Sequence, residues 1–119
     1  MFKQGSFMNA SAINLSEKFA PIRKGLLEFA VLRVVDGEKL YVAEMLQRLA
    51  STAFATQEGT LYPLLSRLRR EGLVDYEWQE SEAGPPRKYY RLTDSGQRAL
   101  VELQGYWQHL TETLTRIGK

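Results

Sequence analysis

The sequence predicts a mainly helical fold with a small β-hairpin, namely a winged helix-turn-helix followed by a C-terminal helix. Three short helical segments precede a stretch in which apolar residues recur at every second position, and one long helical segment follows it. Helix, helix, helix, hairpin is the element order of a winged helix. We expect residues 1–20 to form an arm or one short helix, residues 21–93 the winged-helix domain, and residues 94–119 a dimerisation helix.

The composition argues against several classes of function. The chain has 119 residues, 44% hydrophobic and 25% charged, which is ordinary for one globular domain. It has no cysteine and one histidine, His109, so we expect no metal and no cofactor. His109 lacks an evident nucleophile partner and no glycine-rich phosphate loop follows a strand, so an enzyme is not expected. No segment has the length and apolarity of a membrane span, and we expect a cytoplasmic protein without a membrane partner.

The first three helices are predicted from apolar spacing and from the residues that interrupt it. Residues 22–35 are apolar around almost the whole helix circumference, which indicates that more than one side is covered. A second helix is expected from about Tyr41 to Ala50. A connector over residues 51–55 leads to a third helix from about Gln57 to Glu71, which Gly72 ends.

The hairpin is predicted from a two-residue repeat. Apolar and polar residues alternate over residues 74–79, which is typical of a half-buried strand. A turn-rich loop is expected over residues 81–86, and a returning strand over residues 88–93. The last helix then begins at Thr93 or Asp94, with the spacing of a capping box in the second case.

The third helix has one surface that suits a DNA major groove. Its leucines share one face, whereas the opposite stripe is small near the helix start and carries arginines further along. Small residues let a helix sink into the groove, and arginines reach phosphates or a guanine edge. An ordinary solvated face is an equally good interpretation of this feature alone. The predicted DNA contacts are Gly59, Tyr62, Pro63, Ser66, Arg67 and Arg70.

Pro63 does not fit easily into this helix. It lacks an amide donor and clashes with the carbonyl four residues earlier unless it lies near the helix start. Either the helix begins nearer Gly59, or its first turn is irregular.

The returning strand of the hairpin carries a cluster of positive charge. Arg87, Lys88 and Arg91 follow one another without an acidic residue until Asp94. Such a wing can neutralise phosphates or enter a minor groove, and we expect Arg87 and Lys88 to contact DNA. A solvated charged strand would look similar. The net charge of +2 is compatible with a nucleic-acid partner but does not identify one.

Two motifs together resemble the PadR family of transcriptional regulators. One is EGTLYPLLSRL at residues 58–68 with EGLV at residues 71–74, and the other is GPPRKYYRLTDSG at residues 84–96. The resemblance implies a homodimeric repressor that binds a partly palindromic operator in double-stranded DNA, with the third helix in the major groove and the wing beside it. By position it adds Thr60 to the recognition helix and matches residues 87–90 to the wing strand.

The chain departs from the family at the start of the second helix. The family often has a Gly-Tyr pair there, and the corresponding positions are Val42 and Ala43. Tyr41 lies close enough to substitute for that tyrosine, and we include it among the predicted DNA contacts.

The C-terminal helix carries a seam of apolar residues at alternating spacings of three and four, the a/d pattern of a coiled coil. A lone helix of this length is marginal in water, so the pattern argues for a partner helix. Packing within one subunit is the alternative. The predicted dimer-interface residues are Leu100, Leu103, Trp107, Leu110, Leu114 and Ile117.

Trp107 lies in the middle of this seam. The matching position is a tryptophan in the small, multidrug-responsive PadR proteins with a single C-terminal helix, which this chain resembles and in which paired tryptophans stack on flat aromatic compounds. The resemblance thus predicts a repressor released by a small aromatic or apolar effector that binds at Trp107. Two alternatives remain: Trp107 is simple dimer core, or the chain is a winged-helix protein-interaction module that does not read DNA.

Overall fold

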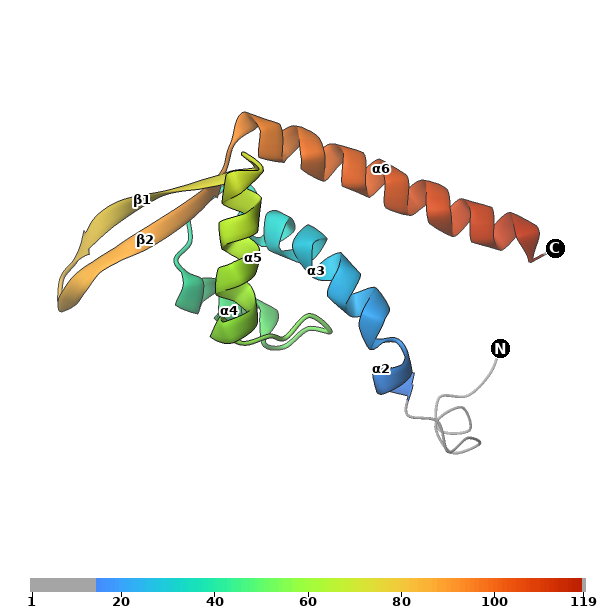
Figure 1. Cartoon of the computed structure of the whole chain (residues 1–119), viewed down its shortest axis with the longest axis horizontal. Helices are drawn as coiled ribbons and strands as arrows, with labels where there is room; N and C mark the ends of the chain where they lie inside the picture. Colours follow the sequence, from blue (N-terminus) through green and yellow to red (C-terminus); the bar gives the residue numbers. More distant parts are fainter. Residues whose placement is uncertain (1–14, 119) are drawn as a thin grey trace.

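The computed structural model describes residues 15–118 (Figure 1). A body of helices lies at the centre, and the β-hairpin and the last helix leave it in opposite directions. This architecture confirms the predicted fold class of helices, hairpin and long C-terminal helix. Most of the expected N-terminal arm lies outside the described residues. The elements are α2 (Leu15–Lys18), α3 (Ala20–Val34), α4 (Val42–Leu49), α5 (Glu58–Arg70), β1 (Val74–Ser81), β2 (Gly84–Leu92) and α6 (Asp94–Ile117).

One apolar core joins the helices to the base of the hairpin. Each of α3, α4 and α5 contributes residues at helical spacing, and the burial of these residues is the main stabilising term of the domain. The predicted helix bounds agree with the structure to within about two residues. The fully buried side chains are Val31, Leu32, Val35, Leu40, Met45, Leu61, Leu65, Leu68 and Val74.

Two prolines occupy different positions in their helices. Pro21 lies in the first turn of α3, where its missing amide hydrogen has no acceptor within the helix. Pro63 lies inside α5, five residues after the helix begins at Glu58. The helical hydrogen bond to the carbonyl of Gly59 is therefore absent, because proline has no amide hydrogen to donate. Gly59 and Pro63 are both exposed, so solvent can donate to that carbonyl instead.

The hairpin is longer than predicted. The strands pair in antiparallel register from Val74 with Leu92 to Ser81 with Gly84, which leaves only residues 82–83 between them. The prediction of a loop over residues 81–86 was therefore wrong. Two consecutive prolines suggested the loop, but each strand has only one partner for most of its length, so prolines are tolerated on the open side.

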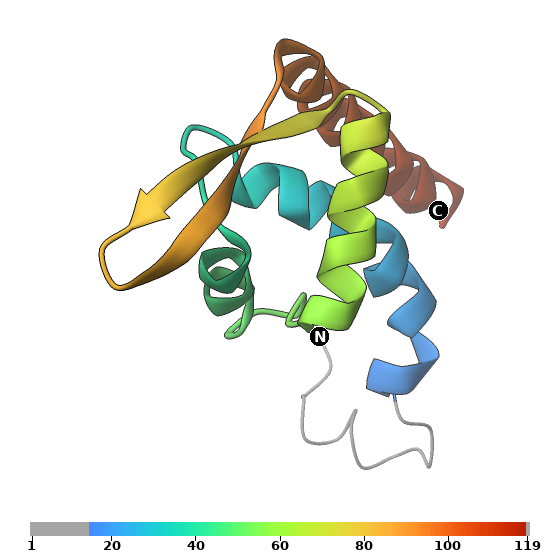
Figure 2. The same cartoon turned by 60° about the vertical axis from the view of Figure 1, so that its left-hand side comes forward.

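Leu40 attaches the hairpin to the helical body. Its amide donates to the carbonyl of Tyr90 at 3.0 Å and its carbonyl accepts from the amide of Tyr90 at 2.8 Å. This isolated bridge lies outside the two-stranded sheet. Figure 2 shows the hairpin standing away from α5 on the side where α4 lies. The wing is consequently fixed at its base.

The start of α6 is held against the turn that follows α5. Thr93 is the N-cap residue; its hydroxyl accepts from the amide of Gly96 at 2.9 Å and donates to the carbonyl of Gly72 at 2.6 Å. The predicted capping box that starts at Asp94 was therefore one residue late. Gly96 is required here because a Cβ at this position would meet the carbonyl oxygen of Leu73.

Candidate nucleic-acid interface

The exposed face of α5 contains every residue that the sequence predicted for it. Four leucines of this helix are buried against the core, which confirms the predicted division of the helix into two faces. Contact with DNA remains a prediction for these residues. The exposed positions are Gly59, Thr60, Tyr62, Pro63, Ser66, Arg67 and Arg70.

The two predicted arginines of α5 have different surroundings. Arg67 donates from Nη2 to Glu28 Oε1 of α3 at 2.6 Å, and its Nε lies 3.8 Å from Glu71 Oε2. Arg70 has no hydrogen bond or ion pair with any other described residue. Arg70 is therefore free to neutralise a phosphate, whereas Arg67 would first have to leave two carboxylates.

The cations of the wing rest on aromatic rings rather than on carboxylates. The guanidinium of Arg87 lies 4.4 Å from the ring centroid of Tyr41, which itself packs edge-on against Tyr89 at 5.3 Å. The ammonium of Lys88 lies 4.5 Å from the ring centroid of Tyr76 and 5.4 Å from that of Trp78. Neither cation forms an ion pair among the described residues, so both charges remain available to an external anion.

Tyr41 lies where α4 meets the wing. It is the N-cap residue of α4, and its amide donates to Glu44 Oε1 at 3.2 Å. The sequence placed Tyr41 near the position of the family's usual tyrosine, and the structure brings its ring to Arg87. Together with Glu58, Tyr62 and Trp78, these two residues line a cavity of about 420 Å³ between α4, α5 and the wing.

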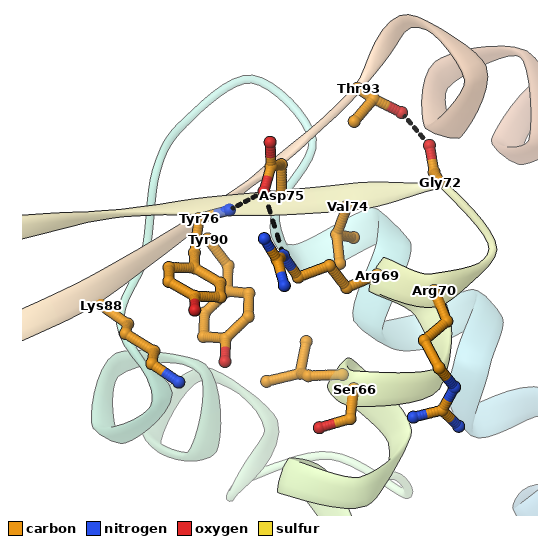
Figure 3. A pocket seen from close by; sticks show the side chains of 11 residues that line it. Ser66, Arg69, Arg70, Gly72, Val74, Asp75, Tyr76, Lys88, Tyr90 and Thr93 are labelled. Atoms are coloured by element: carbon orange, nitrogen blue, oxygen red, sulfur yellow. Dashed lines mark hydrogen bonds and ion pairs between the residues drawn. The ribbon is translucent and has the colours of Figure 1, made fainter.

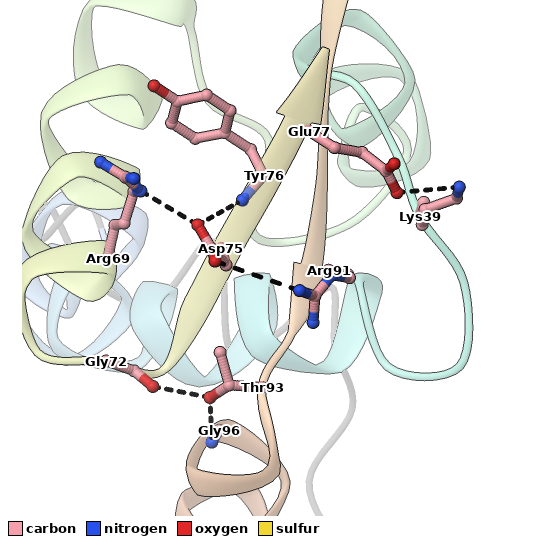
Figure 4. A network of polar contacts seen from close by, with 9 residues as sticks. All are labelled: Lys39, Arg69, Gly72, Asp75, Tyr76, Glu77, Arg91, Thr93 and Gly96. Atoms are coloured by element: carbon pink, nitrogen blue, oxygen red, sulfur yellow. Dashed lines mark hydrogen bonds and ion pairs between the residues drawn. The ribbon is translucent and has the colours of Figure 1, made fainter. Parts of the chain in front are cut away.

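Sequence reasoning did not identify Arg69. Its Nε donates to Asp75 Oδ1 at 3.1 Å and its guanidinium lies 4.5 Å from the ring centroid of Tyr76 (Figure 4). Asp75 also accepts from the backbone amide of Tyr76 at 2.9 Å and lies 4.0 Å from Arg91. The amide of Tyr76, and then Arg69, hold the pKa of the Asp75 carboxyl below its usual value. These contacts depend on the turn at Gly72, so no periodicity in the sequence could indicate them.

An apolar pocket lies on the other side of the body, between α3 and α6. Its volume is about 260 Å³, and Trp107 of α6 closes one side of it. Trp107 keeps 38% of its surface exposed, so its ring is neither buried nor fully solvated. The pocket is lined by Leu26, Phe29, Ala30, Arg33, Phe54 and Trp107.

The predicted seam of α6 divides into two parts. Leu100 is buried in the core of its own subunit and Leu103 packs against that core, so packing within one subunit accounts for these two residues. Leu110 is half-buried, and Leu114 and Ile117 are 64% and 74% exposed. The helix runs through Gly105 without a break. Only the distal part of the seam is therefore left open for a partner.

The described residues contain no helix that is both long and apolar enough to cross a membrane. Within residues 15–118 no three acidic or histidine side chains gather in a way that could hold a metal ion.

The fold and this surface define a class of protein, the winged-helix transcriptional regulators. Residues 31–102 match the family described as the PadR-like transcriptional regulators. The chain belongs to this family, as its motifs suggested. Because the family consists of transcriptional regulators and not of enzymes, the expectation that the chain is not an enzyme is also confirmed.

Two solved structures and one sequence relative support the same assignment. A PadR-like transcription factor from Bacteroides fragilis is 42% identical with a TM-score of 0.74, and the match covers 85% of this chain and 98% of that one. A PadR-family regulator from Eggerthella lenta is 34% identical with a TM-score of 0.79, over 87% and 90% of the two chains. A transcriptional regulator of Mycobacterium tuberculosis is 36% identical over 70% of this chain and 72% of its own.

Proposed function

We propose that the chain binds a partly palindromic operator as a homodimer, with the first half of α5 in the major groove and the wing against the adjacent backbone. Three cations that have no carboxylate partner among the described residues carry this proposal: Arg70 on α5, and Arg87 and Lys88 on the wing. The exposed face of α5 begins with Gly59 and Thr60, whose side chains are small enough for close approach to base edges.

The part of α6 that its own subunit does not cover supports the proposed dimer. Exposed apolar residues at heptad spacing are costly in water, and a second α6 with the α3 beside it would bury them. A chain truncated after Gly105 keeps Leu100 and Leu103 and hence the core. We expect this chain to remain folded and to sediment as a monomer at concentrations where the full chain is a dimer. A truncated chain that stays dimeric would place the interface elsewhere.

The pocket at Trp107 supports the further proposal of a repressor that a small aromatic or apolar molecule releases from its operator. The lining is apolar except for Arg33, and the indole offers a large rigid face for stacking. Since the pocket lies between α3 and α6, a bound ligand could change how the two subunits pack. That change would alter the spacing of the two α5 helices on DNA.

Footprinting on the promoter of the protein's own gene tests the proposal against a winged-helix module that does not read DNA. We expect a symmetric protected site whose affinity falls steeply with salt, because binding releases counterions from the phosphates. A flat aromatic effector should remove the protection. No protected site at low salt would favour the protein-interaction module.

Substitutions of single charges test the assigned surface. Arg70→Ala and Arg87→Ala should each weaken operator binding by about 1–3 kcal/mol or less without a change in melting temperature. Arg98→Ala is the matched control, because Arg98 is an exposed arginine on α6 and its loss changes the net charge equally. Equal affinities for all three variants would contradict the assigned surface.

A further inference from the structure

The cleft between α5 and the wing gathers positive charge from both elements. Its volume is about 470 Å³, and its lining contains three cations but only one carboxylate, Asp75. Figure 3 shows Arg69 and Arg70 on the helix side and Lys88 on the wing side of this cleft. The cleft therefore has the charge of an anion site, and it includes Arg69, which was not among the predicted DNA contacts.

The guanidinium of Arg69 is held in one orientation with part of its donor capacity unused. Its Nε donates to Asp75, and its plane lies over the ring of Tyr76. Its two Nη atoms have no hydrogen-bond partner among the described residues. A guanidinium that is already oriented loses little entropy when it binds an oxyanion through these remaining donors.

The ring of Tyr76 contacts both cations. Arg69 and Lys88 each lie 4.5 Å from the centroid of its ring, one coming from the helix and the other from the wing. Two positive charges that share one ring repel each other, and only Asp75 offsets them. An anion that enters the cleft would relieve this repulsion and accept hydrogen bonds from both groups.

The position of the cleft indicates which anion it meets. Ser66 and Arg70 line the cleft and also belong to the exposed stripe of α5 that we assign to the DNA surface. A DNA backbone that passes between α5 and the wing therefore crosses the opening of the cleft. Resting on the function proposed above, we propose that this cleft binds one backbone phosphodiester of the operator in each half-site, through Arg69 and Lys88 with Tyr76 as their positioning residue.

Neutral backbone substitution tests this contact directly. Methylphosphonates are placed one at a time along the footprinted operator, and the affinity of the full chain is measured for each duplex. We expect one position in each half-site to weaken binding about ten-fold, because a charge-assisted contact is lost there. In Arg69→Ala the same substitution should have almost no further effect, and the slope of log affinity against log salt should fall by about one.

Arg91→Ala is the matched control for that experiment. Arg91 also lies near Asp75, at 4.0 Å, but it does not line the cleft. This variant should keep the ten-fold penalty at the sensitive position. If Arg69→Ala binds the unmodified operator like the unaltered chain, or keeps every methylphosphonate penalty, the cleft is not a phosphate site.

Two variants of Tyr76 separate positioning from folding. Tyr76→Phe keeps the ring and should retain full affinity, whereas Tyr76→Leu should lose about as much as Arg69→Ala. The double variant of Tyr76→Leu with Arg69→Ala should then lose less affinity than the sum of the two single losses. Additive losses in the double variant, at an unchanged melting temperature, would overturn the positioning role of Tyr76.

A free anion is the other source of the same chemistry. Trp78 lies 5.4 Å from the ammonium of Lys88, so its fluorescence should report an anion in the cleft. Inorganic phosphate titrated at constant ionic strength should leave this fluorescence unchanged if the site is used only within the DNA complex. A saturable change that Arg69→Ala abolishes would assign the cleft to a free phosphate instead and overturn the proposal.

These outcomes also separate this proposal from the proposed function. If Arg70→Ala and Arg87→Ala weaken the operator complex but Arg69→Ala does not, the phosphate site in the cleft is rejected and the proposed operator binding stands. A full chain that binds no operator at all would reject both.

Discussion

Helices α5 and α6 both carry leucines at helical spacing, yet they use them differently. All four leucines on the apolar face of α5 are buried within their own subunit. Among the seam residues of α6 only Leu100 is buried, and Ile117 at the end of the helix is 74% exposed. A periodic apolar pattern therefore identifies a helix face that must be buried, but it does not show whether the same subunit or a second molecule buries it.

The difference arises from where each helix lies. α5 sits at the centre of the body, so α3, α4 and the base of the hairpin surround it. α6 begins against the turn after α5 and then extends away from the body, as Figure 1 shows. The first turns of α6 therefore pack against the core through Leu100 and Leu103, whereas the distal turns lie beyond the other helices of the subunit.

The largest effect that tests this comparison concerns leucine-to-alanine substitutions in the two helices. Leu65→Ala removes a fully buried side chain and should lower the free energy of unfolding by about 2–5 kcal/mol. Leu114→Ala removes a side chain that is 64% exposed in the single subunit and should change monomer stability by less than about 0.5 kcal/mol.

Urea unfolding at several protein concentrations measures both variants. Leu65→Ala should be less stable at every concentration, whereas Leu114→Ala should differ from the unaltered chain only where that chain is dimeric. If Leu114→Ala is equally destabilised in the monomer, the distal part of α6 is covered by its own subunit and the comparison fails.

A smaller effect separates the start of α6 from its middle by one type of substitution. Gly96→Ala places a Cβ against the carbonyl of Leu73, a backbone atom that cannot easily move, and should destabilise the domain by about 1–3 kcal/mol. Gly105→Ala meets nothing within 4 Å and should stabilise the helix by about 0.5–1 kcal/mol. Thermal unfolding of the two variants should therefore show shifts of opposite sign, and a stabilised Gly96→Ala would mean that α6 does not pack closely at its start.

Local sequence patterns predicted the elements of this fold better than their ends. Helices α4 and α5 were predicted because one face of each must be buried, and the spacing of their apolar residues identifies that face. The hairpin loop was misplaced because a proline pair usually marks a turn, and only the lack of a second neighbouring strand makes it acceptable here.

The residues of the candidate site could be predicted only as far as the face of the helix on which they lie. Arg67, Arg69 and Arg70 are the same residue type at nearby positions of one helix. Arg67 contacts Glu28 and Glu71, and Arg69 contacts Asp75. Arg70 has no ion-pair partner among the described residues. Glu28 lies in α3 and Asp75 in β1, so the tertiary structure decides which of these arginines is left without an ion pair.

Another prediction concerns Trp107, which lies between the covered and uncovered parts of α6. If the pocket binds a flat aromatic molecule, the molecule should quench the Trp107 fluorescence, because stacking changes the surroundings of the indole directly. Trp78 is 60% exposed on the wing and would confuse the signal, so the measurement uses a Trp78→Phe background. Arg33 in the lining should favour neutral or anionic compounds over cations of the same shape.

Replacing Trp107 with leucine then separates ligand binding from dimer packing. Leucine suits a heptad seam, so the dimer should be retained in either case. If Trp107 serves the pocket, the variant should lose about 1 kcal/mol or more of ligand affinity, measured by calorimetry, because one aromatic stack is gone. Phe29→Leu is the matched control, since Phe29 lines the same pocket from α3 and its loss tests whether any aromatic wall suffices. If a broad panel of aromatic compounds leaves the Trp107 emission unchanged, the residue belongs with Leu114 and Ile117 to the surface that a second subunit covers.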